Sequence, residues 1–201
     1  MTIALHTEQL QYMLTHLVQD VGKVDTLGVF PADCIPSAKV LRVRSRDVCF
    51  IANTDPHGSP GAHWLAFYYR ARYRTLEYFD SYGLPLSLYK TVARSFTDHS
   101  ISIRCTNTVQ LQALDSSVCG FYCVLFLRLC ASYSDDLEGA KKAVEKIRKL
   151  SSESWRRDGK VVERLHKVLH EHSCVLPKPS SFTRQTQACC SYNVKLKRKT
   201  K

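Results

Sequence analysis

The sequence predicts an α+β fold in which one buried helix packs against a mixed β-sheet, and three patterns support this prediction. An almost wholly apolar run, Phe121–Leu129, follows a small polar loop, and its length favours a buried helix over a strand. Two aromatic-rich segments, 63–69 and 75–80, flank a short basic turn and should pair as antiparallel strands. Basic amphipathic patterns towards the C-terminus predict two further helices, at about 137–151 and 160–171.

The remaining segments are assigned from periodicity and turn residues. Alternating apolar residues favour strands, 3.6-residue periodicity favours helices, and clusters of glycine, proline and short polar residues favour loops. In order, we expect a helix from Thr7, a loop at 27–33, strands at 38–43 and 48–52, a helix at 87–98, and strands at 101–105 and 108–112.

Composition limits the class of protein. The chain of 201 residues is 44% hydrophobic, which is enough for one domain with an appendage. Its apolar stretches are shorter than the roughly 18 residues that a membrane span requires, and its N-terminus lacks the pattern of a signal peptide. The nine cysteines follow no framework spacing, so we expect a reduced intracellular protein without a membrane partner.

Positive charge is concentrated near the C-terminus. Residues 139–201 hold 17 Lys and Arg against 5 Asp and Glu, a net +12, so the whole-chain value of +11 leaves −1 for the rest. This asymmetry predicts a folded core at 1–136, a basic helical extension at 137–176 and a flexible basic tail at 177–201. The basic part is typical of polyanion binding, and the candidate nucleic-acid contacts are Lys141, Lys142, Lys146, Lys149, Arg156, Arg157 and Lys160.

A possible catalytic set emerges from the predicted elements. Cys119 lies at the N-terminus of the central helix, where backbone N–H groups and the helix dipole favour a thiolate. His63 begins one predicted strand and Asp80 ends its antiparallel partner, so both lie at the same end of the sheet. Cys119 would be the nucleophile, His63 the proton carrier, and Asp80 the group that orients the imidazole. A buried core cysteine is the alternative interpretation of Cys119.

Gln112 is the candidate for stabilising an oxyanion. Its side-chain amide would donate a hydrogen bond together with the backbone N–H of Cys119, and one such donor contributes about 3–4 kcal/mol in known enzymes. Gln110 shares its face by two-residue alternation, so spacing alone favours Gln112. Gly120 is expected to leave room for a substrate carbonyl beside the sulfur.

Several short motifs surround the candidate residues: Leu27-Gly28-Val29-Phe30, 49–54, 61–67, 78–83, Gln112 and 119–123. Together these motifs resemble the adenovirus-type cysteine endopeptidases and, more distantly, the SUMO-specific proteases of the same clan. The His-to-acid separation of 17 residues fits both branches, and the Gln-to-Cys separation of 7 fits the adenoviral branch. Asp80 departs from the adenoviral pattern, where the acid is usually Glu. Proteases of virus-like DNA transposons of the Polinton/Maverick kind are also similar.

The resemblance implies a papain-like, adenain-like core that cleaves viral precursor proteins after Gly-containing sequences. It implies no cofactor for the chemistry, but activation by DNA or by a peptide, with Cys105 near the family's peptide-binding cysteine. The expected partners are polypeptide substrates and non-specific DNA, for a monomer in the host nucleus or virion. The alternatives are an isopeptidase for a ubiquitin-like modifier, or a catalytically dead DNA-binding scaffold.

A zinc site is a further alternative near the C-terminus. Only His166 and His170 of its candidate ligands share a helix face, and the spacing does not match a zinc finger. An ordinary solvated helix is the preferred interpretation of this segment, whose other candidate ligands are His172 and Cys174.

Overall fold

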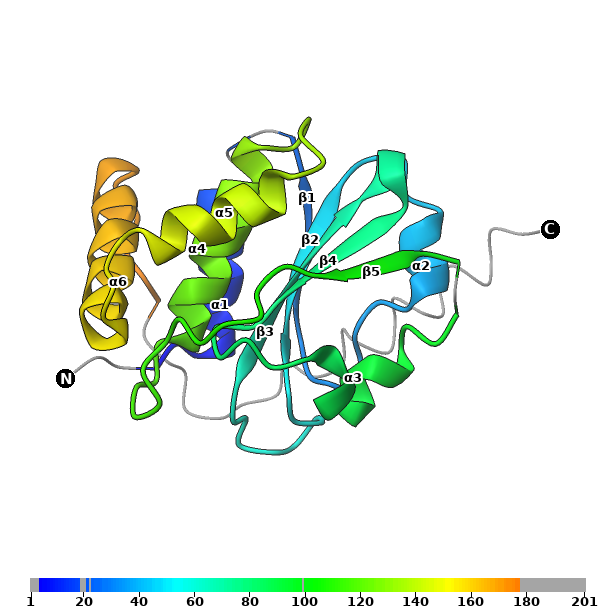
Figure 1. The fold of residues 1–201 in the computed structure, drawn as a ribbon, viewed down its shortest axis with the longest axis horizontal. Coiled ribbons are helices and arrows are strands. Elements are labelled where there is room, and N and C mark those ends of the chain that lie inside the picture. Colours follow the sequence, from blue (N-terminus) through cyan, green and yellow to red (C-terminus); the bar gives the residue numbers. More distant parts are fainter. Residues whose placement is uncertain (1–3, 19–20, 22, 99, 178–201) are drawn as a thin grey trace.

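The fold is built on a five-stranded mixed sheet, shown in Figure 1. The structure is a computed structural model that describes residues 4–18, 21, 23–98 and 100–177. The strands lie in the order β1-β2-β3-β4-β5; the outer pairs β1/β2 and β4/β5 are parallel, and the inner pairs are antiparallel. The strand bounds are Asp25–Phe30 for β1, Val48–Asn53 for β2, Trp64–Arg70 for β3, Thr75–Phe79 for β4 and Ser102–Cys105 for β5.

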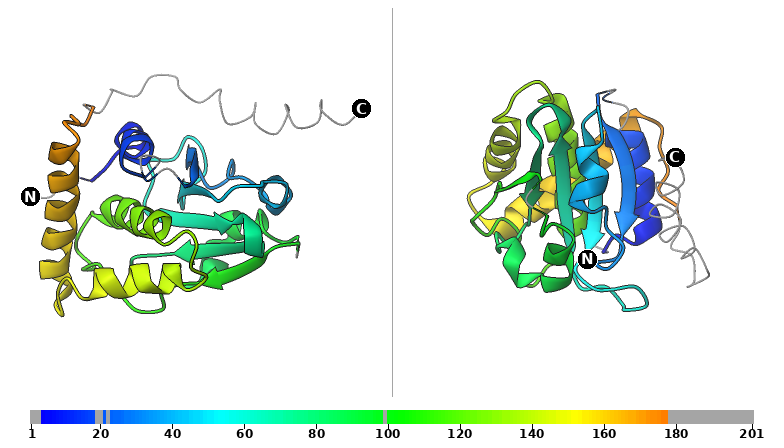
Figure 2. Two further views of the ribbon diagram at one scale, coloured as in Figure 1. Left: turned by 90° about the horizontal axis from the view of Figure 1, so that it is seen from above. Right: turned by 90° about the vertical axis from the view of Figure 1, so that its right-hand side faces the viewer.

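Helices cover both faces of this sheet, as the layers in Figure 2 show. One layer contains α1, Thr7–Met13, continued by the π-helical turn Leu14–Val18, together with α4, Cys119–Ser132, α5, Gly139–Arg148, and α6, Ser154–Glu171. The other contains α2, Ala38–Arg42, and α3, Lys90–Arg94. Short 3-10 turns lie at Ala71–Tyr73 and Leu86–Leu88. Because both faces are covered, β2 and β4 are buried along their whole length, although β4 includes the polar residues Thr75 and Glu77.

The central helix α4 is the most buried of the helices that the structure describes. Twelve of its 14 residues are buried, and they pack against β3, α1, α5 and α6. Phe126 stacks on Phe79 of β4, with ring centroids 4.5 Å apart. The predicted α+β architecture, with an apolar helix against a mixed sheet, is confirmed.

Local sequence patterns misled the prediction at four places. The predicted loop at 27–33 contains most of β1, because Gly28, at φ +124°, forms a bulge and does not end the strand. The predicted strand at 38–43 is helix α2, whose Ala38 and Leu41 are buried at helical spacing. The helix expected at 87–98 is a 3-10 turn followed by α3, and 108–112 forms no strand.

The two C-terminal helices belong to the main hydrophobic core. Ala143 and Ile147 of α5, and Val161 and Leu165 of α6, are fully buried in the cluster that contains α4. The predicted division at residue 136 stays a prediction, but the helices beyond it complete the layer that covers α4. The predicted tail at 177–201 lies outside the described residues except for Pro177. Within the described ranges, no helix is both long and apolar enough to cross a membrane.

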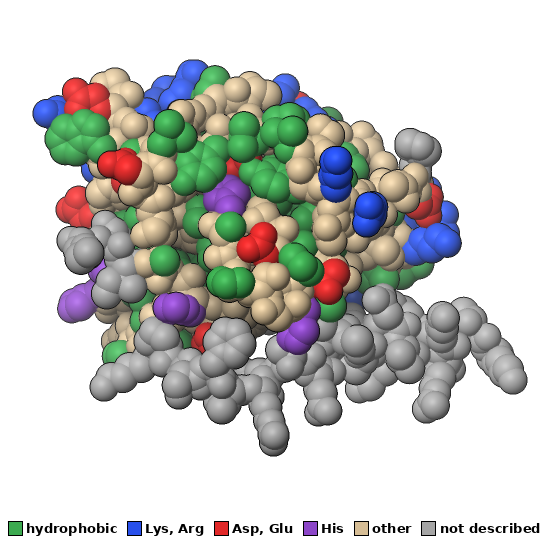
Figure 3. Space-filling view, turned by 90° about the horizontal axis from the view of Figure 1, so that it is seen from below, with side chains coloured by type: hydrophobic (Ala, Val, Ile, Leu, Met, Phe, Trp, Pro, Cys, Tyr) green, Lys and Arg blue, Asp and Glu red, His purple; other side chains and the backbone are tan. Residues whose placement is uncertain are grey.

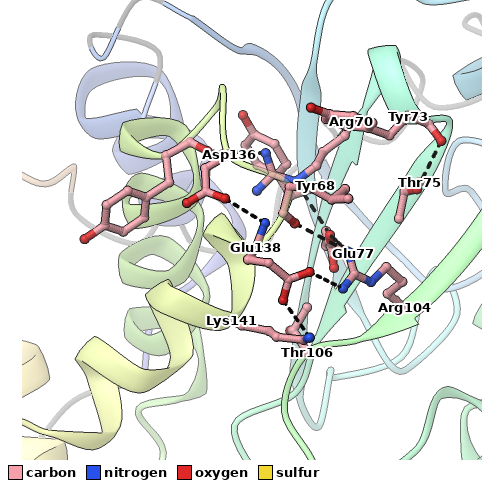
Figure 4. Close-up of polar contacts among 12 residues, drawn as sticks. Tyr68, Arg70, Tyr73, Thr75, Glu77, Arg104, Thr106, Asp136, Glu138 and Lys141 are labelled. Carbon is pink, nitrogen blue, oxygen red and sulfur yellow. Dashed lines mark hydrogen bonds and ion pairs between the residues drawn. The ribbon is translucent and has the colours of Figure 1, made fainter.

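A buried charge network joins the sheet to the loop between α4 and α5 (Figure 4). Arg70 of β3 is fully buried, and its Nη1 donates to the Ser134 carbonyl at 3.0 Å. Its Nε lies 3.6 Å from Oε1 of Glu77, which Arg104 of β5 approaches at 3.5 Å. Arg104 also binds Glu138 at 2.9 Å. Burial raises the pKa of Glu77, and Arg104 and Arg70 offset this only in part.

We expect Arg70→Met to lower the free energy of unfolding by about 3–5 kcal/mol, because it leaves the Glu77 carboxylate buried beside one half-exposed arginine. Urea denaturation at pH 8 would measure this loss. The double variant Arg70→Met/Glu77→Gln should recover much of it, since both charges are then absent. The loss should also be smaller at pH 5, where Glu77 takes up a proton more readily. A double variant no more stable than Arg70→Met would contradict this account.

Candidate active site

The antiparallel pairing of β3 and β4 brings His63 and Asp80 together. Ala66 of β3 pairs with Phe79 of β4. His63, just before β3, and Asp80, just after β4, therefore lie at the same end of the sheet. His63 Nε2 lies 2.7 Å from Asp80 Oδ1, and the two side chains are 9% and 0% exposed. The structure therefore places these two sequence-predicted residues in direct contact.

The carboxylate of Asp80 is held by four hydrogen bonds. Oδ1 accepts from His63 Nε2 and from the backbone N–H of Tyr82 at 2.9 Å. Oδ2 accepts from the Tyr89 hydroxyl at 2.9 Å and from the backbone N–H of Leu84 at 3.2 Å. Donors on every side fix the orientation of the carboxylate and, through it, that of the imidazole ring.

Two neighbouring groups raise the pKa of His63. Burial alone would lower the pKa of its imidazole, but hydrogen bonds with Asp80 and Cys119 outweigh burial and raise the pKa from 6.5 to about 9. Since Nε2 is used by Asp80, Nδ1 is the ring nitrogen left for Cys119. A histidine with a pKa near 9 carries a positive charge at neutral pH, next to the thiol.

Helix α4 places Cys119 next to His63. The helix begins at Cys119, so its backbone N–H is one of the first-turn donors that have no acceptor within the helix. One turn further on, the thiol of Cys123 donates to the carbonyl of Trp64, the residue after His63, at 3.3 Å. This bond ties α4 to the start of β3. Burial raises the pKa of the Cys123 thiol well above its usual value, which sets it apart as a structural cysteine.

Gly120 was expected to leave room for a substrate carbonyl, but in the structure the N-terminal segment packs against it. A Cβ at this position would lie 3.1 Å from Leu10 Cδ2 and 3.2 Å from Leu5 Cβ. The backbone of Leu5 also accepts a hydrogen bond from the Trp64 indole at 3.2 Å. The small residue after Cys119 therefore allows the N-terminal segment to approach α4 closely.

Gln112 lies beside the site, fully buried, with its amide engaged. Its Oε1 accepts from the Ser81 hydroxyl at 2.8 Å, and its Nε2 donates to the Ser116 carbonyl at 2.7 Å and to the Tyr82 hydroxyl at 3.2 Å. The Ser116 carbonyl fixes the amide orientation, because a flipped amide would place two acceptors in contact. Gln110, the alternative, donates to the Gln112 carbonyl at 2.9 Å.

Sequence reasoning missed the residues that support this set. Ser81 binds both the backbone and the side chain of Gln112, and Tyr82 lies against the His63 ring with centroids 4.8 Å apart. The signals available for them were their position directly after Asp80 and their place in the motif 78–83. Tyr89, nine residues beyond Asp80, could not have been found, because an irregular turn and a 3-10 helix separate the two.

The side chains predicted to contact nucleic acid differ in their exposure and in their existing partners. Lys141, Lys142, Lys149 and Arg156 form ion pairs with Glu138, Asp136, Glu145 and Glu153, and their side chains are 58–72% exposed. Lys146 is exposed near the ring of Tyr133, and exposed Lys160 donates to the Leu150 carbonyl. Arg157 contradicts its prediction, because it is only 5% exposed and bonds to backbone carbonyls inside the protein.

Cys105 and the candidate zinc ligands have separate settings. Cys105 is exposed at the end of the edge strand β5, where a bond to an activating peptide stays a prediction. His166 of α6 lies against the ring of Phe121. In the part of the chain that the structure describes, no group of three or more His, Cys, Asp or Glu side chains could hold a metal ion.

An α+β core that places a helix-terminal cysteine against a histidine and a carboxylate is the arrangement of papain-like thiol hydrolases. The sequence matches the family described as adenovirus endoprotease over residues 27–198, and the chain belongs to this family. It is 30% identical over 135 residues to the protease of human adenovirus D serotype 17, covering 61% of this chain and 63% of that protein. It is 32% identical over 103 residues to the protease of porcine adenovirus A serotype 3, covering 45% and 50%. The chain thus matches half to nearly two thirds of the length of these relatives.

Solved structures of low sequence identity share the fold. ChlaDub1 from Chlamydia trachomatis superposes with a TM-score of 0.55 at 14% identity, covering 90% of this chain and 99% of that one. The C. trachomatis effector Cdu1 bound to ubiquitin gives a TM-score of 0.53 at 16% identity, covering 90% and 99%. At these identities the similarity establishes the papain-like, adenain-like fold.

The raised pKa of His63 depends on Asp80, so we expect Asp80→Asn to lower it. The stability that this charge contributes is fully present below pH 6.5 and is lost as the pH rises through about 9. A pH titration of the His63 ring resonances by NMR would measure both proteins. Tyr89→Phe is the matched control, because it removes one contact of Asp80 and keeps its charge. Identical titrations of the wild type and Asp80→Asn would contradict this assignment.

Proposed function

We propose that this protein is a cysteine endopeptidase with Cys119 as nucleophile, His63 as proton carrier and Asp80 as the orienting acid. The observation that carries the proposal is the 2.7 Å contact of His63 with Asp80, beside a cysteine that begins the central helix. Membership of the adenovirus endoprotease family supports the same activity. A site with these three groups in contact suits acyl transfer through a thioester.

The proposed reaction has two halves. In the proposed resting state His63 already holds the proton that Cys119 has given up, and Cys119 attacks the peptide carbonyl as a thiolate, forming a C–S bond and a tetrahedral oxyanion. The C–N bond then breaks, the imidazolium gives its proton to the leaving amine, and an acyl-enzyme remains. In the second half, His63 takes a proton from water, the resulting hydroxide attacks the thioester, and Cys119 leaves as the thiolate. Asp80 keeps the imidazole oriented and stabilises its positive charge throughout.

Two N–H groups are suited to the oxyanion. One is the first backbone N–H of α4, at Cys119, which also has the positive end of the helix dipole behind it. The other is the side-chain amide of Gln112. Its hydrogen bond to Tyr82, at 3.2 Å, is longer than the one to Ser116, at 2.7 Å, and is the bond that a developing oxyanion would replace.

The substrates we propose are extended segments of precursor proteins of a DNA virus or virus-like element, met in the nucleus or in a particle. Exposed apolar side chains follow the site residues along the chain: Leu84 and Leu88 after Asp80, and Leu114 after Gln112. Seen from the side of these loops, hydrophobic side chains gather near the middle of the surface, as Figure 3 shows. Such a surface suits an unfolded peptide segment.

We expect iodoacetamide at neutral pH to alkylate Cys119 faster than Cys105, although Cys105 is the more exposed, because the imidazolium of His63 favours the Cys119 thiolate. Peptide mapping by mass spectrometry would follow both sites. Cys119→Ala should abolish hydrolysis of Gly-containing peptides and leave thermal unfolding nearly unchanged, while the matched control Cys105→Ser should retain activity. Equal labelling of the two cysteines would remove the basis of the enzyme assignment.

A second assay can separate the alternative, a deconjugase of a ubiquitin-like modifier. The fold neighbour Cdu1, whose structure includes ubiquitin, is the observation that keeps this alternative open. Hydrolysis of a fluorogenic ubiquitin C-terminal substrate would be compared with hydrolysis of its free peptide. Turnover of the free peptide at least as fast supports the endopeptidase, and preference for the folded modifier supports the alternative.

We also propose that the basic C-terminal part binds DNA through phosphates, as its net charge suggests. Lys141→Gln/Lys142→Gln/Lys146→Gln on α5 should weaken binding to two unrelated duplexes alike and reduce the salt dependence, whose log–log slope is about −0.9 per phosphate neutralised. Fluorescence anisotropy at several salt concentrations would measure this. Lys39→Gln/Arg42→Gln/Lys90→Gln on the opposite layer is the control. Substitution is preferable to deleting 139–201, which removes buried Ile147 and Leu165. Equal salt-dependence slopes for the α5 variant and the wild type would exclude this role for α5.

A further inference from the structure

We propose that Arg157 and Asp158 of α6 are positioning residues that hold the segment 111–113, and with it Gln112, at the active site. This inference rests on the proposed function, in which Gln112 donates to the oxyanion. Both side chains are charged, and both are nearly buried, at 5% and 7% exposure. They lie in a helix that the sequence assigned to a basic extension, and the reaction scheme above does not use them.

Arg157 fixes the residue before Gln112. Its Nη1 donates to the Leu111 carbonyl at 2.7 Å, and its Nε donates to the Ser151 carbonyl at 2.9 Å. Nη2 reaches the Ser152 carbonyl at 3.1 Å. The guanidinium therefore connects the loop between α5 and α6 to the backbone of the segment that carries Gln112.

Asp158 fixes the residue after Gln112 and also holds α4. Its Oδ2 accepts from the backbone N–H of Ala113 at 3.2 Å, and its Oδ1 accepts from the Tyr122 hydroxyl at 2.8 Å. Tyr122 lies one turn beyond Cys119 in α4. One carboxylate thus joins the element that carries the proposed nucleophile to the element that carries the proposed oxyanion donor.

The held segment forms no sheet ladder that could place it instead. Residues 108–112 are not a strand, and the backbone N–H groups of Leu111 and Gln112 both donate to the Ser81 carbonyl, at 2.8 and 3.1 Å. The segment is therefore held from one side by Ser81, next to Asp80, and from the other side by α6. Because a displacement of about 1 Å can cost a hundredfold in rate, support on the second side bears directly on turnover.

The chemistry of the two side chains also favours a specific role over general packing. A buried charge costs free energy unless hydrogen bonds compensate it, and an apolar side chain would fill the same space at lower cost. The neighbouring positions on this face of α6, Val161 and Leu165, are apolar and serve packing alone. Two adjacent charged residues that bracket Gln112 have a definite use, because only polar groups can bind the Leu111 carbonyl and the Ala113 N–H.

The test is Asp158→Asn in the full chain. The asparagine keeps the shape of the side chain but places an N–H₂ donor where one carboxylate oxygen now accepts from the Ala113 N–H or the Tyr122 hydroxyl. We expect kcat for peptide hydrolysis to fall by about tenfold to a hundredfold with KM nearly unchanged. The rate of Cys119 alkylation by iodoacetamide should stay the same, because that displacement forms no oxyanion. Glu163→Gln, an exposed site on the same helix, makes the same charge change and should leave kcat unaltered.

A double-mutant cycle separates positioning from loosening of the fold. Asp158→Asn should have little further effect on kcat in a Gln112→Ala background, because the group that it positions is gone. Arg157→Lys, which retains a donor towards Leu111, should lower kcat less than Arg157→Met, and this pair replaces Asp158→Asn if that variant unfolds. Full activity of Asp158→Asn, equal losses in alkylation and hydrolysis, or additive effects would overturn this inference alone. A wild type without peptidase activity would overturn the proposed function as well.

Discussion

The burial of α4 against the inner strands of the sheet is the interaction on which the rest of the structure depends. Twelve of its 14 residues are buried, and the Cys123 thiol fixes its register by bonding to the Trp64 carbonyl. That register places Cys119, one turn earlier, next to His63. The apolar run of the helix and the reactive end of the helix are therefore two parts of one constraint: the packing that stabilises the fold also sets the position of the thiol.

Asp80 connects the sheet to the site in a second way. Its carboxylate orients His63, while the Tyr82 N–H, the Leu84 N–H and the Tyr89 hydroxyl hold the carboxylate itself. The next residue, Ser81, binds the segment of Gln112 through its carbonyl and its hydroxyl. Two consecutive residues after β4 thus serve the proton carrier and the proposed oxyanion donor. This explains why the turn after β4 is so densely hydrogen-bonded.

The C-terminal helices have two kinds of surface with different roles. Their outer faces carry exposed lysines and arginines, several of which are paired with neighbouring carboxylates. Their inner faces complete the core around α4 and present Arg157 and Asp158 to the segment 111–113. The net charge of this part of the sequence predicts the properties of the outer faces of α5 and α6 but not those of their inner faces. A part of the chain that looks like an appendage by composition therefore contributes to the fold and, in our proposal, to the geometry of the site.

The sequence alone determined the central helix, the antiparallel pair that places His63 near Asp80, and the position of Cys119 at a helix N-terminus. These follow from strong local signals: a long apolar run, aromatic strands around a short turn, and polar residues at strand ends. Only the tertiary structure decided that Gly28 forms a bulge within a strand and that Arg157 is buried. It also decided that Leu5 packs closely against Gly120. It alone also showed Tyr89 and Asp158 bonding to groups distant in sequence. The physical reason is that hydrogen bonds to backbone carbonyls and amides in irregular segments leave no periodicity, so their partners are fixed only when the chain is packed.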